Sequence, residues 1–157
     1  MGEQRLEFRR ERFDAADASA LVQAQEAEVR ARGDAGDLSP PREASIFEPP
    51  EGAFIVMRDG DGAIGCGGVC RLDAARAELK RMYLAPAARG KGLGRLLLRR
   101  LEEEAKGLGY DRLVLETITL MSEAIGLYES SGYTAIPPYG PYAQNPTSRC
   151  YEKSLSG

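Results

Sequence analysis

Residues 77 to 118 carry the feature that most constrains the fold of this chain. A predicted strand, AELKRMYL (77–84), ends before Pro86. The amphipathic helix GLGRLLLRRLEEEAKGLG covers 92–109, and a second strand, DRLVLETI (111–118), follows at once. Two successive strands of one sheet that are joined by a helix run parallel, because the helix returns the chain to the end where it entered. The sequence therefore predicts a βαβ unit near the centre of a sheet.

The start of that helix has an unusual charge distribution. Residues 84 to 100 contain five basic side chains and no acidic one. The N-terminus of a helix is already partly positive and normally favours carboxylates. A local conflict of this kind tends to mark function, and it indicates that an anion binds at this end of the helix.

The remaining elements are predicted from periodicity and turn residues. Leu6, Phe8 and Arg10 alternate with polar residues as in a strand, and Asp14 is a candidate N-cap for a helix over 15–33, in which Leu21, Val22, Gln25 and Val29 share one face. A loop over 33–52 contains one helical turn near 43–47. Further strands are expected at 53–59 and 63–72, joined by a hairpin link of Asp and Gly. After the βαβ unit, we expect a helix at 121–132 and strands at 133–136 and 148–155. This order predicts an α/β fold with a mixed sheet of six or seven strands flanked by helices.

Composition narrows the class of protein. A chain of 157 residues with a net charge of −3 is expected to be a single domain, residues 1–157, without the broad basic surface that nucleic-acid binding needs. The absence of histidine excludes Ser-His-Asp and Cys-His catalysis and argues against a metal site. No apolar run suggests a signal peptide or a membrane span, so we expect a cytoplasmic protein. Cys66, Cys70 and Cys150 have no disulfide-framework spacing and are interpreted as small core residues.

The glycine loop at 89–95 has the chemistry of an anion-binding site. Glycines at a strand-to-helix junction let backbone N–H groups approach a ligand, and the helix start adds further donors. A dinucleotide fingerprint, G-x-G-x-x-G, fails because its last position falls on Arg95 or Leu97, and a Walker loop fails because no hydroxyl residue follows Gly90-Lys91. The alternative is that the glycines form only a tight turn and that the arginines of the loop are solvated. For Arg99 and Arg100, further along the helix, a solvated face is the favoured interpretation.

Arg89-x-x-Gly92-x-Gly94 matches R-x-x-G-x-G, the acyl-coenzyme A signature of the GNAT (GCN5-related) acetyltransferases. The similarity extends over roughly residues 50 to 155 and includes Tyr128 and the pair Gly132-Tyr133. The chain therefore resembles that family. The resemblance implies the GNAT acyltransferase fold and an N-acetyltransferase that uses acetyl-CoA without a metal.

The resemblance also implies roles for residues of this chain. The diphosphate of acetyl-CoA is expected at the glycine loop. Its pantetheine arm is expected along the preceding strand, where the central strands part. A backbone N–H near Tyr83 or Leu84 would polarise the thioester carbonyl. Tyr128 is the expected general acid, or else an aromatic core residue. Glu116 and Glu78 are the candidate general bases. Alternatively, Glu78 pairs with Lys80 or Arg81. The expected cofactor-binding residues are Met82, Tyr83, Leu84, Arg89, Gly90, Lys91, Gly92, Leu93, Gly94 and Arg95.

The acceptor is expected to be a small amine such as an amino acid, a polyamine or an aminoglycoside, in preference to a protein lysine or N-terminus. Tyr139, Tyr142 and Asn145 are candidate substrate-binding residues, facing an acidic loop that contains Asp34, Asp37, Glu43 and Glu48. Met121 replaces an asparagine that contacts pantetheine in many relatives, so that contact is either absent or supplied by Ser122 or the backbone. Two alternatives are a catalytically silent acyl-CoA sensor and a different phosphate-loop protein; a homodimer is expected by analogy with relatives.

Overall fold

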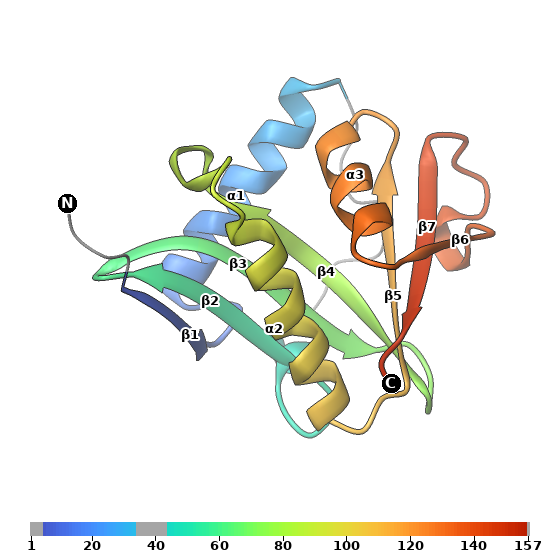
Figure 1. Cartoon of the computed structure of the whole chain (residues 1–157), viewed down its shortest axis with the longest axis horizontal. Coiled ribbons are helices and arrows are strands. Elements are labelled where there is room, and N and C mark those ends of the chain that lie inside the picture. The colour runs from blue at the N-terminus through green and yellow to red at the C-terminus, as the bar shows by residue number, and fades with distance from the viewer. Residues whose placement is uncertain (1–4, 34–43, 157) are drawn as a thin grey trace.

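The computed structural model describes residues 5–33 and 44–156. Figure 1 shows a twisted sheet with helices on both sides. The strands are β1 (Leu6–Arg10), β2 (Ala53–Asp59), β3 (Gly62–Arg71), β4 (Arg76–Leu84), β5 (Arg112–Ile118), β6 (Thr134–Ile136) and β7 (Ser148–Ser154). The α-helices are α1 (Ala16–Ala31), α2 (Leu93–Gly107) and α3 (Ser122–Ser130), and short 3₁₀ turns cover Ala44–Phe47, Pro86–Ala88 and Gly140–Tyr142.

The seven strands form one mixed sheet in the order β1-β2-β3-β4-β5-β7-β6. Strand β4 pairs parallel with β5, and each of the other neighbouring pairs is antiparallel. The predicted βαβ unit is β4-α2-β5, and it lies at the centre of the sheet, as expected. The mixed α/β fold predicted from the order of elements is confirmed.

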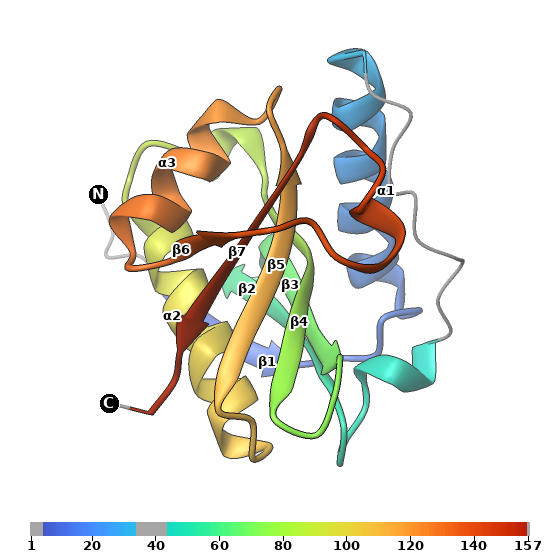
Figure 2. The same cartoon turned by 90° about the vertical axis from the view of Figure 1, so that its right-hand side faces the viewer.

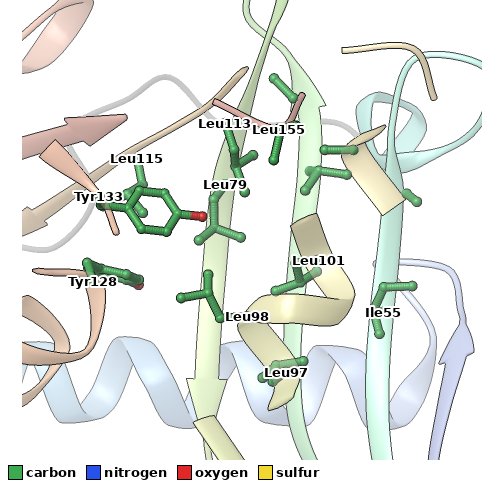
Figure 3. Close-up of a cluster of buried hydrophobic side chains, with 14 of the residues drawn as sticks. Ile55, Leu79, Leu97, Leu98, Leu101, Leu113, Leu115, Tyr128, Tyr133 and Leu155 are labelled. Carbon is green, nitrogen blue, oxygen red and sulfur yellow. The ribbon is translucent and has the colours of Figure 1, made fainter. Parts of the chain in front are cut away.

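The helices divide between the two faces of the sheet. Figure 2 shows α2 and α3 on one face and α1 on the other. Under α2 lies the larger core cluster, in which Leu97, Leu101, Leu113 and Leu115 are at most 1% exposed (Figure 3). A smaller cluster under α1 contains Phe47, Phe54 and Val56. The sheet is therefore buried on both faces at its centre, which fits the largely apolar sequences of β2 and β3.

Two glycines in β3 set how closely the layers approach the sheet. A Cβ atom on Gly67 would lie 2.5 Å from Leu101 Cδ1 of α2, and one on Gly68 would lie 2.5 Å from the ring of Phe47 on the other face. Real Cβ atoms essentially never show such contacts, so a larger residue at either position would force Leu101 or Phe47 to shift. The run Gly67-Gly68 thus permits close packing of α2 above the sheet and of Phe47 below it.

One local detail differs from the sequence expectation, and another agrees with it. The N-cap of α1 is Ala15 rather than Asp14, because the Asp14 carboxylate accepts hydrogen bonds from Arg12 at 2.8 and 2.9 Å. The hairpin link is as predicted, with Asp59 opposite Gly62 and Gly60 at φ +62°. Within residues 5–33 and 44–156, no helix combines the length and the apolar character that crossing a membrane requires.

Candidate active site

The central parallel strands part halfway along their length. Pairing of β4 with β5 ends at Leu79 and Leu115. On its other side β4 carries one extra residue opposite Gly67, so that Cys66 pairs with Tyr83 but Gly68 pairs with Lys80. Within this bulge Arg81 adopts φ +60°, a left-handed conformation that non-glycine residues rarely adopt. The bulge turns the second half of β4 away from β5, and the slot expected between these strands is present.

The parted half of β4 presents backbone groups to the slot. Ala85 N donates to Ile64 O of β3, and backbone groups alternate in direction along a strand. The backbone groups of Leu84 therefore point away from β3, and so does the Met82 carbonyl. Consistent with this, Met82 O accepts a hydrogen bond from Gln25 Nε2 at 2.9 Å, and Leu84 O accepts one from Arg89 Nε at 2.9 Å. By the same alternation, the backbone groups of Tyr83 point toward β3, where Tyr83 is opposite Cys66.

Two cavities of about 160 and 170 Å³ open along this slot. The first, here called the strand cavity, reaches Leu115, Glu116 and Tyr142. The second, the loop cavity, reaches Leu84, Arg89 and Gly94. The two cavities share one set of lining residues, Gln25, Met82, Met121, Ala124 and Tyr128. They therefore meet at a junction that these five side chains surround.

The glycine loop stands where the loop cavity meets the N-terminus of α2. Gly90 and Gly92 adopt φ +79° and +78°, and Gly92 is the N-cap of α2. The first-turn N–H groups, those of Leu93, Gly94 and Arg95, have no acceptor within the helix. Gly94 lines the loop cavity, and a Cβ there would meet only Leu127 Cδ2, at 3.5 Å. These N–H groups lie where the sequence predicts that an anion binds.

Two of the three loop cations are held by neighbouring elements. Arg89 Nη2 donates to Glu28 Oε2 of α1 at 2.7 Å, and its guanidinium stacks over Tyr83 at 5.5 Å. Arg95 donates to Ser130 Oγ and Ser131 Oγ after α3, at 2.9 and 3.0 Å. Lys91 is exposed. The hydrogen bond from Arg89 is the main reason why the pKa of Glu28 lies below its usual value.

Tyr128 lies at the junction of the two cavities. Its side chain is buried, its ring packs edge-on against Tyr133 at 5.8 Å, and its hydroxyl lies 3.8 Å from Met82 Sδ (Figure 3). Burial, with a smaller contribution from the charge of Glu116, raises the pKa of the phenol. The hydroxyl therefore stays protonated at neutral pH and is able to donate a proton or a hydrogen bond.

The two candidate carboxylates have different surroundings. Glu116 lines the strand cavity and accepts a hydrogen bond from Ser148 Oγ at 2.7 Å. Glu78 lines neither cavity and is 3% exposed. Its Oε2 accepts from Tyr139 at 2.9 Å and from Tyr142 at 3.4 Å. Glu78 therefore supports the tyrosines beside the cavity, while Glu116 faces the cavity itself.

The predicted substrate residues come partly together. Tyr142 and Asn145 line the strand cavity, whereas Tyr139 does not and instead packs edge-on against Tyr142 at 5.5 Å. Lys80, which sequence reasoning considered only as a partner of Glu78, donates to the Tyr142 hydroxyl at 2.6 Å and also lines the cavity. Of the acidic loop, Asp34, Asp37 and Glu43 lie outside the described residues, and Glu48 pairs with Arg12.

Gln25 is one of the lining residues that the sequence analysis did not identify as part of the site. It is shared by both cavities, as is Met121, the residue that departs from the family pattern. The signal was available, because Gln25 is the one polar residue on the apolar face of its helix that Leu21, Val22 and Val29 define. A polar side chain on a buried face needs a partner, and that need places it near polar groups.

The three cysteines and Arg100 lie apart from this chemistry. In the part of the chain that the structure describes, Cys66, Cys70 and Cys150 form no disulfide and are buried, as expected of core residues. Burial raises the pKa of Cys66 to about 12 and that of Cys150 to about 11, so both stay thiols at neutral pH. Arg100 packs over Phe8 of β1 and pairs with Glu104, so it points to the sheet edge and not to the glycine loop.

Comparison with known proteins agrees with this architecture. The profile of the Acetyltransferase (GNAT) family matches residues 18–133. A protein of Azospirillum brasilense named IAA acetyltransferase is 36% identical over 126 residues, which are 76% of this chain and 82% of that protein. A crystal structure from Klebsiella pneumoniae, of a protein named as an acyl-CoA N-acyltransferase, superposes with a TM-score of 0.82 at 30% identity and covers 96% of this chain and 98% of its own.

A more distant structure shares the fold and contains a ligand. It is an acetyltransferase of Salmonella typhimurium, yncA, solved with its cofactor acetyl-CoA; it has a TM-score of 0.70 at 20% identity and covers 97% of this chain and 95% of its own. The family profile spans the βαβ unit, the glycine loop and Tyr128, which are the elements that build the slot. This chain therefore belongs to the GNAT family of acetyltransferases.

Proposed function

We propose that this protein transfers the acetyl group of acetyl-CoA to the nitrogen of a small primary amine. The observation that carries the proposal is the meeting of the two cavities beside Tyr128. One cavity begins at an anion-binding glycine loop, and the other runs to the carboxylate of Glu116. A thioester that enters from the loop side meets an amine that enters from the other side at a single point.

The loop cavity has the groups that acetyl-CoA requires. The backbone of the glycine loop, residues 89–95, and the N-terminus of α2 would bind the diphosphate. Gly94 leaves room beside Leu127 where any side chain would fill the cavity. The parted edge of β4 would receive the pantetheine arm, with backbone groups of Leu84 available to it. Because the hydrogen bond from Ala85 N to Ile64 O implies that the Leu84 backbone groups point away from β3, Leu84 is the better candidate for the oxyanion donor.

The strand cavity supplies a proton acceptor for the amine. When bound, acetyl-CoA supplies an activated acyl carbon, so direct attack by the amine needs no enzyme nucleophile. The ammonium form must lose one proton before attack and the nitrogen a second one after the new C–N bond has formed. Glu116, oriented by the hydrogen bond from Ser148, would accept these protons directly or through water.

Tyr128 would serve the leaving group. Cleavage of the C–S bond produces a thiolate, and a neutral phenol at the junction would donate its proton to that sulfur. The raised pKa of Tyr128 keeps it protonated for this step. The proton that the nitrogen gives up then restores the phenol through solvent, which balances the reaction.

The shape and charge of the strand cavity favour a small acceptor. The cavity lies between α1 and the segment that joins β6 to β7, which are on the same face of the sheet (Figure 2). Its lining contains two acidic side chains, Glu26 and Glu116, and two basic ones, Lys80 and Arg81. Such a balanced lining suits a small amine that also carries polar or anionic groups, such as an amino acid.

The experiment is a titration followed by an activity screen. Calorimetry with acetyl-CoA, and with coenzyme A as comparison, measures binding; thiol release is then followed with amino acids, polyamines, aminoglycosides and a lysine-containing peptide, and products are identified by mass. We expect submillimolar binding and turnover of a small amine. Binding without turnover of any amine would support the silent sensor, and turnover of the peptide alone would support a protein acetyltransferase.

A further inference from the structure

Gln25 has a hydrogen-bonding arrangement that its own fold leaves incomplete. Its Nε2 donates to Met82 O at 2.9 Å. A carbonyl oxygen only accepts hydrogen bonds, so this contact fixes which end of the amide faces β4. The other end, Oε1, is buried and has no hydrogen-bond partner among the described residues. A buried acceptor without a partner is rare in native proteins and calls for an explanation.

The position of Gln25 supplies that explanation. It is one of the five residues that line both cavities, together with Tyr128 and Met82. The amide is held in place by the bulged part of β4, so Oε1 has a fixed direction. A group that fills the junction and carries a hydrogen-bond donor would satisfy it.

The chemistry of the reactants indicates which group this is. The acetyl thioester has a carbonyl oxygen and a sulfur but no hydrogen-bond donor at the reacting end. The attacking nitrogen, in contrast, carries N–H bonds that point away from its lone pair. At the point where the two cavities meet, the amine is therefore the donor that the Gln25 oxygen lacks.

We propose that Gln25 binds the acceptor amine, with Oε1 accepting an N–H hydrogen bond from the attacking nitrogen and so directing its lone pair toward the thioester carbon. This inference rests on the proposed function. A neutral amide suits the task better than a carboxylate, because it orients the nitrogen without stabilising the ammonium form, which cannot attack. Glu116 remains the proton acceptor, and Gln25 sets direction.

The test uses Gln25→Met, which keeps the volume of the side chain and removes the oxygen, with Gln23→Met as matched control. Gln23 is exposed on the same helix, and its Nε2 donates to Ser19 Oγ. With the best amine of the screen, we expect Gln25→Met to raise KM for the amine by about tenfold or more and to leave the acetyl-CoA Kd within about twofold. Gln23→Met should match the parent protein. Thermal melting checks that both variants fold.

Gln25→Glu supplies a readout that a structural role would not move. A carboxylate in this place would stabilise the ammonium form, so the pH profile of kcat/KM should shift to higher pH by about one unit or more. If Gln25→Met instead weakens acetyl-CoA binding as much as amine binding, the oxygen serves the pantetheine arm and the inference is wrong. Unchanged kinetics in both variants, or loss of folding with normal kinetics of the folded fraction, would also overturn it.

A binding measurement separates this inference from the proposed function. Calorimetry of the amine panel against the chain loaded with coenzyme A needs no turnover. Amine binding that Gln25→Met abolishes, in a chain without turnover, would uphold the role of Gln25 and refute the transferase activity. Turnover that Gln25→Met leaves unchanged would uphold the transferase activity and refute the role of Gln25. If the chain loaded with coenzyme A binds no amine, the inference is also wrong.

Discussion

The guanidinium of Arg89 lies 2.7 Å from the carboxylate of Glu28, 61 residues earlier in the chain, so helix α1 holds the first cation of the glycine loop. Glu28 also contacts Arg32 at 3.2 Å, and Arg32 contacts Glu123 of α3 at 2.5 Å. Four alternating charges thus join the loop, α1 and α3 around the loop cavity. The excess of cations at the start of α2 is therefore partly compensated by the fold itself.

The first prediction concerns stability. Because the folded-state pKa of Glu28 is lowered, chiefly by Arg89, its ionised form stabilises the fold above its ordinary pKa of 4.5, and this contribution is lost as pH falls through the lowered value. Glu28→Gln should therefore reduce the free energy of unfolding at pH 7 by at most about 1 kcal/mol. The difference should shrink as pH falls below 4.5 and through the lowered pKa of Glu28. Urea unfolding at several pH values measures it, with Glu103→Gln as an exposed control; an equal loss at every pH would contradict the argument.

The second prediction concerns the loop cations. The double variant Arg89→Ala, Lys91→Ala should weaken acetyl-CoA binding by about tenfold at low salt, because two charges near the diphosphate are removed. Its affinity should also depend less steeply on salt than that of the parent protein. Calorimetry at two salt concentrations measures both effects. Lys106→Ala, at the far end of the same helix, is the control; equal affinities for all three proteins would show that these cations serve another purpose.

The third prediction concerns Tyr128. Removal of a general acid typically costs about 10²-fold or more in rate, so Tyr128→Phe should lower kcat by that factor and leave the acetyl-CoA Kd within about twofold. Tyr133→Phe is the control, because its ring contacts Tyr128 but its hydroxyl donates to Glu102. Because the pKa of Tyr128 is raised, the phenol stays protonated as pH is raised. The kcat of the parent protein should therefore show no decrease between neutral pH and about pH 10. A decline at lower pH that disappears in Tyr128→Phe would refute this.

The fourth prediction separates the two carboxylates. Glu116→Gln should slow turnover at neutral pH and recover as pH rises, because solvent then deprotonates a growing share of the amine. Glu78→Gln should leave the shape of the pH profile unchanged, since Glu78 lines neither cavity and bonds to Tyr139 and Tyr142. Rate against pH for both variants decides the matter. The reverse result would make Glu78 the proton acceptor.

The fifth prediction concerns Gly94. Alanine at this helical position meets only Leu127 and should preserve or raise stability, by up to about 1 kcal/mol from helix propensity. The same methyl group projects into the loop cavity, so acetyl-CoA binding should weaken. Gly126→Ala in α3 is the control, because its Cβ meets nothing within 4 Å and it lines neither cavity. Thermal melting measures stability, and calorimetry measures acetyl-CoA binding. If Gly94→Ala binds acetyl-CoA as tightly as the parent protein, the ligand lies elsewhere.

The sequence predicted the elements that depend on local patterns. The stripe of Leu93, Leu97 and Leu101 identified α2, and the Asp-Gly link identified the β2–β3 hairpin, because helix periodicity and turn conformation are encoded by neighbouring residues. The glycine loop was found in the same way. The order of these elements then sufficed for the mixed sheet.

The sequence could not predict how distant side chains meet. Glu78 and Glu116 look alike as acids in central strands, and their different roles depend on the segment after β6, which brings Tyr139 and Tyr142 to Glu78. Likewise, Gln25 was visible as a polar residue on an apolar face, but its partner, Met82 O, lies 57 residues away. Contacts of this kind depend on the register of β4 and on the placement of α1.

By itself, then, the sequence determined the βαβ unit, the glycine loop and the family, since each is written in residues that are close together along the chain. Only the tertiary structure decided that β4 bulges at Arg81, that two cavities meet beside Tyr128 and that Glu28 holds Arg89. The physical reason is that these features depend on packing between elements, and packing is a property of the whole fold rather than of any one segment.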